Sequence, residues 1–162
     1  MKLFDAPAAP SARRVRIFIA EKGLDIDRVP LDLMAGEHRQ PAYLAINPRG
    51  MVPVLRLDDG TVIDDSHGIC RYLEALHPDP PLLGRTPVEA GLVESWVRRV
   101  DSDGYQAVTY NLRNTDPRFA GRAVAGKWPD MPQIPALAAR GKAMFAAFTR
   151  ALAQTGIVAW EG

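Results

Sequence analysis

The sequence has little of several features that mark specialised classes of protein. It contains one cysteine, Cys70, so it can form neither an internal disulfide bond nor a C-x-x-C redox pair. Its 20 lysine and arginine residues nearly balance its 19 aspartate and glutamate residues, and a net charge of +1 gives no electrostatic reason to expect a nucleic-acid partner. No apolar run approaches the roughly 18 residues needed to span a bilayer. The first residues, MKLFDAPAAP, lack the apolar stretch of a signal peptide. We therefore predict a cytoplasmic protein that binds neither nucleic acid nor membranes.

The chain does have enough apolar material for a core. Apolar residues make up 47% of its 162 residues, a length that suits one medium domain, or one small domain with part of another. Cys70 falls within an apolar helical pattern, and we predict that it is a core residue and not a redox nucleophile.

The first third of the chain alternates strand and helix signals. A short strand is expected at 2–5, a helix at 11–23 and a second strand at 27–33. Ser11 is a favoured residue for the N-cap of that helix, and Gly23 is a favoured residue for its end. This order predicts a β-α-β unit with two parallel strands.

The pattern then changes to a hairpin followed by a helix. Residues 34–49 are expected to form a loop with a helical turn near 41–46. Two apolar runs, 52–57 and 61–63, flank a D-D-G turn and predict an antiparallel hairpin. A helix follows within 65–78. Together these elements predict an α/β fold on a mixed four-stranded sheet with flanking helices.

Beyond this point the strand signals disappear. We predict a first domain at 1–78, a Pro/Gly-rich linker at 79–87 and a partial all-helical domain at 88–162. The second domain contains two amphipathic helices, 88–112 and 136–154. Two such helices leave their apolar stripes with few partners, so this domain is expected to be incomplete.

One feature of the hairpin conflicts with the strand prediction. In GMVPVLRL, residues 50–57, a proline lies inside the most strand-like run of the chain. Proline has no N–H to give to a ladder and is confined to strand edges, strand starts and bulges. By itself, Pro53 indicates an edge strand.

Three stretches carry a family resemblance. The first is APAAPSARRVRIFIAEKGL, and the second is GEHRQPAYLAINPRGMVPVLRLDDGTVIDDSHGICRYLEALHP. The third lies within the second and consists of NPRGMVPVL followed by an acid–Ser pair and ICRYLE. They resemble the glutathione S-transferases. The resemblance implies a thioredoxin-like first domain followed by helices. Residues 88–155 are similar to the first two helices of the family's second domain, so the chain resembles a C-terminally shortened, bacterial-type cytosolic member.

The resemblance gives Pro53 a second interpretation. It implies a cis bond between Val52 and Pro53, which turns the Val52 N–H and C=O outward, unpaired. The edge formed by Met51, Val52 and Pro53 would then pair with the cysteinyl backbone of glutathione as an added strand.

The resemblance also assigns the two ends of the ligand. Asp65 would hold the γ-glutamyl amine, and the hydroxyl and N–H of Ser66 would hold the adjacent carboxylate; both residues also suit a helix N-cap. His38 or Arg39, which would otherwise be solvated loop residues, would bind the glycyl carboxylate.

Ser11 is the candidate for catalysis. Its alternative role is the helix N-cap, yet Arg13 and Arg14 follow it and place positive charge at the positive end of a helix dipole. A local preference broken in this way hints at function. The resemblance implies that the Ser11 hydroxyl would donate a hydrogen bond to the glutathione sulfur.

The expected function is therefore that of a glutathione transferase. Glutathione would be the co-substrate, its thiolate would attack a small electrophile, and the chain would form a homodimer without a metal. Two alternatives remain open. One is a glutathione-dependent disulfide reductase, and the other is a non-catalytic, chaperone-like binding module with the same fold.

Overall fold

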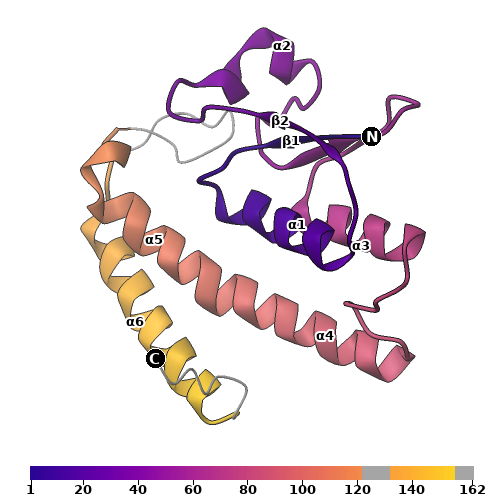
Figure 1. Cartoon of the computed structure of the whole chain (residues 1–162). Helices are drawn as coiled ribbons and strands as arrows, with labels where there is room; N and C mark the ends of the chain where they lie inside the picture. The colour runs from indigo at the N-terminus through magenta and orange to yellow at the C-terminus, as the bar shows by residue number, and fades with distance from the viewer. Residues whose placement is uncertain (122–131, 156–162) are drawn as a thin grey trace. The chain divides into compact units, whose positions relative to one another are not determined.

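The computed structural model describes residues 1–121 and 132–155 (Figure 1). The chain forms two compact units, of which the first covers residues 1–85 and the second begins at Thr86. Within the described residues, no helix is both long and apolar enough to cross a membrane.

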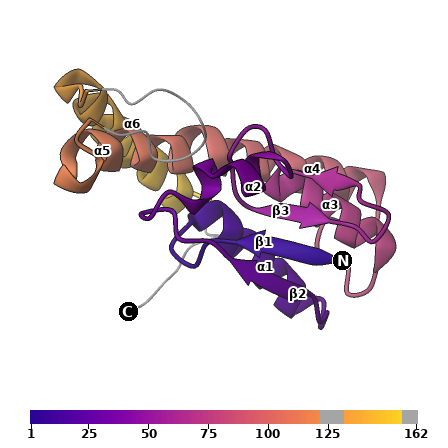
Figure 2. The same ribbon diagram turned by 90° about the horizontal axis from the view of Figure 1, so that it is seen from above.

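The first unit contains a sheet and its helices. Its elements are, in chain order, β1 (Lys2–Asp5), α1 (Pro10–Glu21), β2 (Asp27–Pro30), the 3-10 helix η1 (Glu37–Arg39), α2 (Pro41–Leu44), β3 (Val54–Arg56), β4 (Val62–Ile63) and α3 (Ser66–Leu76). The strand order is β2-β1-β3-β4 (Figure 2). β1 pairs in parallel with β2, and β3 pairs antiparallel with both β1 and β4. The predicted α/β fold on a mixed four-stranded sheet is confirmed.

The alternation of side chains along the strands builds a core on each face of the sheet. Leu3 of β1 and Leu55 of β3 pack on one face against α1 and α3, which run along it side by side (Figure 1). The neighbouring residues Phe4 and Val54 point to the other face, where they pack against Tyr43 of α2. Cys70 is buried in the first of these cores, as predicted from its apolar surroundings.

Three elements differ from the predicted boundaries. α1 begins at Pro10 with Ala9 as its N-cap, so the prediction that Ser11 caps this helix is wrong. The reason is that proline is favoured at the first helical position, which moves the helix start ahead of Ser11. β2 ends at Pro30 and not at residue 33, because the Asp32 side chain accepts hydrogen bonds from the N–H groups of Met34 and Ala35 and turns the chain. β3 begins only after Pro53.

A buried ion pair joins the ends of α1 and α3. The Lys22 side chain is fully buried, lies 2.5 Å from a Glu74 carboxylate oxygen and donates to the His77 carbonyl at 2.7 Å. The other Glu74 oxygen accepts the N–H groups of Leu82 and Leu83 at 3.0 Å each. Burial raises the pKa of Glu74, but the hydrogen bonds from Lys22 and Leu83 outweigh it and hold that pKa below its usual value. Glu74 is therefore charged at neutral pH and fixes the segment that follows α3.

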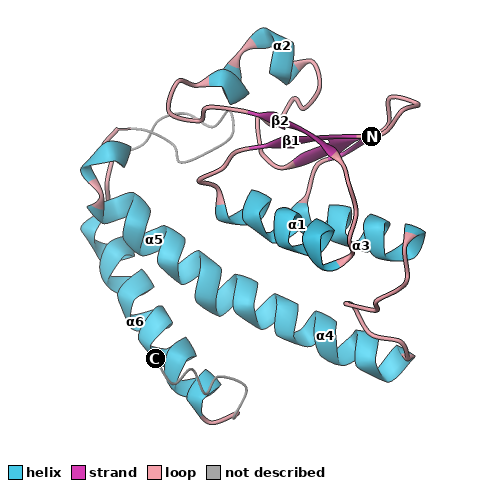
Figure 3. Cartoon of the chain, viewed as in Figure 1, coloured by secondary structure: helices cyan, strands magenta, loops and turns pink. Residues whose placement is uncertain are grey.

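In its described residues, the second unit has helices and no strands (Figure 3). The predicted helix over 88–112 is one continuous rod made of α4 (Pro87–Arg99), the π-helical segment η2 (Val100–Tyr105) and α5 (Gln106–Thr115). A short 3-10 helix, η3 (Pro117–Phe119), follows it, and α6 (Pro135–Ala153) matches the predicted last helix.

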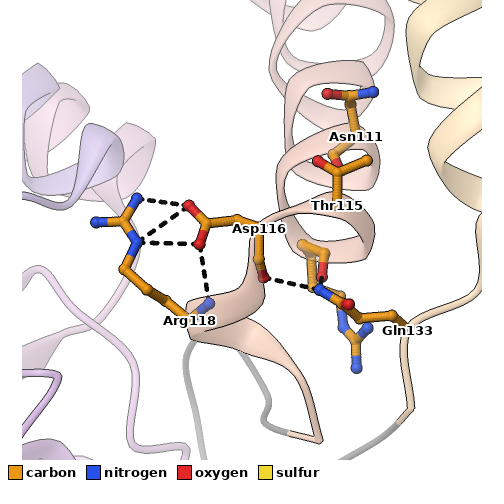
Figure 4. A network of polar contacts seen from close by, with 6 residues as sticks. Asn111, Thr115, Asp116, Arg118 and Gln133 are labelled. Carbon is orange, nitrogen blue, oxygen red and sulfur yellow. Dashed lines mark hydrogen bonds and ion pairs between the residues drawn. The ribbon is translucent and has the colours of Figure 1, made fainter.

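Polar side chains close the junction between α5 and α6. The Gln133 amide donates to the carbonyl of Arg113 at 3.1 Å and to that of Asp116 at 2.8 Å (Figure 4). The buried Asn114 accepts the N–H of Ile134 at 2.8 Å. The two Gln133 bonds satisfy carbonyls at the end of α5 that have no partner within the helix, and the Asn114 bond satisfies an N–H at the start of α6.

α5 and α6 approach each other closely at Gly141. A Cβ atom added to Gly141 would lie 2.5 Å from the Ala107 carbonyl oxygen and 2.7 Å from the Asn111 nitrogen, both backbone atoms of α5. Backbone atoms cannot move aside as a side-chain tip can, so this contact requires glycine.

We expect Gly141→Ala to lower the free energy of unfolding by about 1–3 kcal/mol, the usual cost of overpacking. Gly91→Ala is the matched control, because Gly91 lies in α4 with no atom within 4 Å of its added Cβ. That change should stabilise the protein by up to about 1 kcal/mol through helix propensity. Chemical denaturation of both variants checks the pair, and equal effects would contradict the close approach at Gly141.

Candidate functional site

The predicted ligand edge lies between the end of the loop and the start of β3. The Val52–Pro53 peptide bond is cis, Val52 is buried and Met51 is half-buried. The Met51 carbonyl accepts a hydrogen bond from the Tyr43 hydroxyl at 2.5 Å and another from the Asn47 amide at 3.0 Å. Two side chains from the preceding segment therefore hold this edge in place.

The carbonyl of Val52 is not unpaired. It accepts a hydrogen bond from the Ser11 hydroxyl at 3.1 Å, which corrects the prediction that both Val52 backbone groups face outward without a partner. A carbonyl oxygen has two lone pairs, so one remains. The Val52 N–H has no hydrogen-bond partner among residues 1–121 and 132–155. This edge therefore still offers one donor and one acceptor position.

The start of α3 presents acceptor and donor groups together. Asp65 is its N-cap, and one carboxylate oxygen accepts the N–H groups of His67 at 2.8 Å and Gly68 at 3.2 Å. The N–H of Ile69 is bonded to the Asp65 carbonyl within the helix. Of the first N–H groups of α3, only that of Ser66 lacks an acceptor in the described part of the chain. The predicted capping by Asp65 is confirmed, and its second carboxylate oxygen is not used by the cap.

α1 contributes two polar side chains to this region, three residues apart and so on one face of the helix. Ser11 contacts Val52, as described above. Arg14 donates through one guanidinium nitrogen to the Ser66 hydroxyl oxygen at 2.9 Å and contacts Nε2 of His67 at 2.7 Å. One face of α1 thus links the Val52 edge with the start of α3.

The two predicted basic residues lie in η1. His38 is only 3% exposed, whereas Arg39 is half-buried. Arg39 is the more exposed of the two, and its guanidinium fork suits a carboxylate, so the structure favours Arg39.

Sequence reasoning missed Tyr43, Asn47 and the contacts of Arg14. The signal for Asn47 was present, because an asparagine followed by proline and glycine often bonds the backbone two residues on. Its side-chain oxygen does accept the N–H of Arg49 at 3.0 Å. The Arg14 contacts join residues 52 and 53 positions apart and leave no local pattern, whereas the bond from Tyr43 to Met51 spans eight positions and follows no capping or turn motif.

Two side chains near the site have perturbed acidity. Burial raises the pKa of Tyr43 to about 12, opposed by the hydrogen bond with Asn47 and assisted by the charge of Asp64. Burial also raises the pKa of the Cys70 thiol to about 11, against the effect of the positive charge of Arg14. Cys70 is therefore a thiol at neutral pH, in keeping with its place in the core.

The comparisons with known proteins identify this architecture. Residues 3–81 match the family described as glutathione S-transferase, N-terminal domain. The chain is similar to glutathione S-transferase 2 of Saccharomyces cerevisiae, with 39% identity over 119 residues that cover 72% of this chain and 51% of that protein. It is also similar to maleylacetoacetate isomerase of Pseudomonas aeruginosa, with 48% identity over 90 residues that cover 54% of this chain and 42% of that protein.

A solved structure extends the similarity to both units. The crystal structure of a glutathione S-transferase domain-containing protein from Marinobacter aquaeolei VT8 superimposes with a TM-score of 0.79 at 32% identity, covering 94% of this chain and 72% of that one. The chain belongs to the glutathione S-transferase family. It spans about half the length of the curated relatives that it matches.

The raised pKa of Tyr43 predicts a stability change at high pH. The unfolded phenol ionises near its ordinary pKa of 10.0 and the folded one near a pKa of about 12. The stabilisation by neutral Tyr43 is therefore complete below pH 10 and is lost as the pH rises toward 12. Each pKa unit corresponds to about 1.36 kcal/mol. The wild type should therefore lose unfolding free energy between pH 10 and about 12 more steeply than Tyr43→Phe. Tyr105→Phe, at an exposed tyrosine, should keep the steep decline, and parallel curves for wild type and Tyr43→Phe would contradict the burial effect.

Proposed function

We propose that this chain binds glutathione and activates its thiol for attack on a small electrophile, as a glutathione transferase does. The observation that carries the proposal is the start of α3, where a carboxylate oxygen of Asp65 and two donors of Ser66 lie side by side and unused by the fold. An acceptor anion beside an N–H and an O–H suits a ligand end that carries an ammonium and a carboxylate together. The γ-glutamyl end of glutathione is such a group.

Each part of the ligand then has a place in the first unit. Asp65 binds the ammonium, and the N–H and hydroxyl of Ser66 bind the carboxylate at a helix N-terminus, where the dipole favours an anion. The cysteinyl backbone pairs with Val52, and Met51 and Pro53 form the rest of that edge. Arg39 binds the glycyl carboxylate.

The chemistry follows from the thiol's position near the start of α1. A helix N-terminus stabilises a thiolate and so lowers the pKa of a bound thiol. The S–H proton leaves to solvent, and sulfur bonds to the electrophilic carbon. In a substitution the leaving group departs with its electron pair, whereas in an addition the substrate takes up a proton. Ser11 would donate to the sulfur, for which its hydroxyl must turn from the Val52 carbonyl. We also propose a cytoplasmic homodimer, on the basis of family membership alone.

The similarity to maleylacetoacetate isomerase favours a second reaction of the same thiol. There the sulfur would add to a double bond and leave again after rotation, so that glutathione is regenerated. Assays of glutathione with an aryl halide and with a cis-configured unsaturated keto acid distinguish the two. Conjugate formation supports the first reaction, and isomerisation without consumption of glutathione supports the second.

The role of Asp65 can be tested without loss of the helix cap. Asparagine caps helices as well as aspartate does, so Asp65→Asn should leave the unfolding free energy within about 0.5 kcal/mol of the wild type. It should weaken glutathione binding by about 1.5–3 kcal/mol, the range for a hydrogen bond to a charged group. Asp64→Asn removes the same charge one residue earlier and should leave affinity unchanged. Calorimetric titration with glutathione measures both, and equal affinities would remove Asp65 from the site.

Ser11→Ala tests whether the hydroxyl acts on the thiol or only on Val52. If Ser11 bonds the sulfur as proposed, the pKa of the bound thiol should rise by about one unit, equivalent to about 1.36 kcal/mol. Turnover should then fall at neutral pH and recover at high pH, where the thiolate forms unaided. Ser95→Ala, at an exposed serine of α4, is the control. Weaker glutathione binding with an unchanged thiol pKa would assign Ser11 to holding the Val52 carbonyl instead.

A further inference from the structure

The side chain of Arg14 decides how the Ser66 hydroxyl can be used. We propose that Arg14 is a positioning residue, which orients the Ser66 O–H toward the ligand and thereby selects γ-glutamyl thiols that carry a free carboxylate beside the amine. The inference rests on the proposed binding of glutathione at the start of α3.

The argument begins with the donors and acceptors of the two side chains. A guanidinium group can only donate hydrogen bonds, whereas a serine hydroxyl has one proton and two lone pairs. The contact at 2.9 Å therefore uses a lone pair of Ser66 and leaves its proton to be given elsewhere. Ser66 is 4% exposed, and within residues 1–121 and 132–155 its hydroxyl has no acceptor. A buried hydroxyl that cannot donate is costly, so this proton is reserved for an acceptor that arrives with the ligand.

His67 fixes the position of the guanidinium. Because arginine cannot accept, Nε2 of His67 must accept the second contact of the same Arg14 nitrogen, at 2.7 Å. The nitrogen is thus held between two acceptors on consecutive residues of α3. Its place over the helix start does not depend on the ligand, and the Ser66 hydroxyl is oriented before binding.

The same arrangement defines the chemistry of the preferred ligand. The oriented O–H, the free N–H of Ser66 and the nearby guanidinium charge all favour an anionic acceptor at one point. The carboxylate of Asp65, the residue before Ser66, disfavours a second anionic group and suits the ammonium group of the ligand. A γ-glutamyl group without its carboxylate would satisfy Asp65 but would leave the Ser66 O–H buried without an acceptor.

Arg14 is not needed to hold α1 against α3. The two helices are already joined by apolar packing of Val15 and Phe18 on Ile69 and Leu73, all buried. Removal of the guanidinium should therefore change ligand selection more than folding. Arg13 provides a matched control, since it is exposed and its side chain has no polar contact in the described part of the chain.

The test is calorimetric titration of the whole chain with two ligands. One is glutathione, and the other is γ-aminobutyryl-cysteinyl-glycine, which keeps the amine but lacks the adjacent carboxylate. Methionine keeps the aliphatic stem and the helix propensity of arginine. Arg14→Met should weaken glutathione binding about tenfold, within the range for loss of a charge-assisted contact, with binding of the analogue changed less than about twofold. Arg13→Met should bind both ligands as the wild type does.

Two further variants exclude a merely structural effect. Arg14→Lys keeps a donor nitrogen and should restore at least part of the glutathione affinity, and it also covers the case in which Arg14→Met does not fold. In a Ser66→Ala background, Arg14→Met should cause little further loss, because the two residues act through one hydroxyl. In turnover assays, Arg14→Met should raise the KM for glutathione with kcat little changed.

Three results would overturn the proposal. The first is that Arg14→Met loses affinity equally for glutathione and for the analogue. The second is that Arg13→Met and Arg14→Met lose the same affinity for glutathione. The third is that the losses of glutathione affinity caused by Arg14→Met and Ser66→Ala add up in the double variant. If the wild type binds glutathione and Arg14→Met binds each ligand as tightly as the wild type does, the positioning role alone fails. If the wild type gives no heat with either ligand, the proposed function fails, and this inference fails with it.

Discussion

The architecture of the site depends on how two consecutive carbonyl groups are held. Met51 and Val52 lie outside the regular ladder, so their backbone groups are not fixed by strand pairing. Side chains replace the ladder, since Tyr43 and Asn47 donate to the first carbonyl and Ser11 donates to the second. Each hydrogen bond of this kind contributes only about 0.5–1.5 kcal/mol in net terms, but a buried carbonyl without a donor would cost more. The edge is therefore shaped before any ligand arrives.

α1 extends this preorganisation to the second half of the site. Ser11 and Arg14 lie three residues apart, and they reach Val52 and the start of α3 respectively. The distal end of the same helix is fixed by the ion pair of Lys22 with Glu74. A shift of this end of α1 would separate the two charges and leave them buried without a partner, which is strongly destabilising. This end of α1 therefore has little freedom to move. A rigid helix thus couples the Val52 edge to the start of α3, the two halves of the proposed site.

The order of elements could be predicted from sequence because it rests on local signals. Apolar spacing, the D-D-G turn and the acid before α3 each act over a few residues, and they gave the sheet and the cap at Asp65. The start of α1 was misplaced because Pro10 outweighs the capping preference of Ser11. The contact of Arg14 with Ser66 joins residues 52 positions apart, so no window along the chain contains both partners. The bonds to the Met51 carbonyl span only four and eight positions, but they do not follow from apolar spacing. The prediction of an unpaired carbonyl at Val52 was wrong because its partner, Ser11, lies 41 residues earlier in the chain.

The π-helical segment η2 gives the second unit's long rod one place where its length could change. A residue occupies about 100° of an α-helix, and a π-helical turn holds more residues than an α-helical one. A deletion of one residue between 100 and 105 would let the rod close into ordinary α-helical turns with α5 in nearly the same rotation relative to α4, because the π-helical turn already holds the extra residue. Ala107 and Asn111 would then still face Gly141 of α6. A deletion within the ordinary α-helical turns of the rod would instead rotate every residue beyond it by about 100°. Within η2 itself, Gly104 is fixed by composition, because a Cβ atom added to it would lie 2.8 Å from the Phe148 ring.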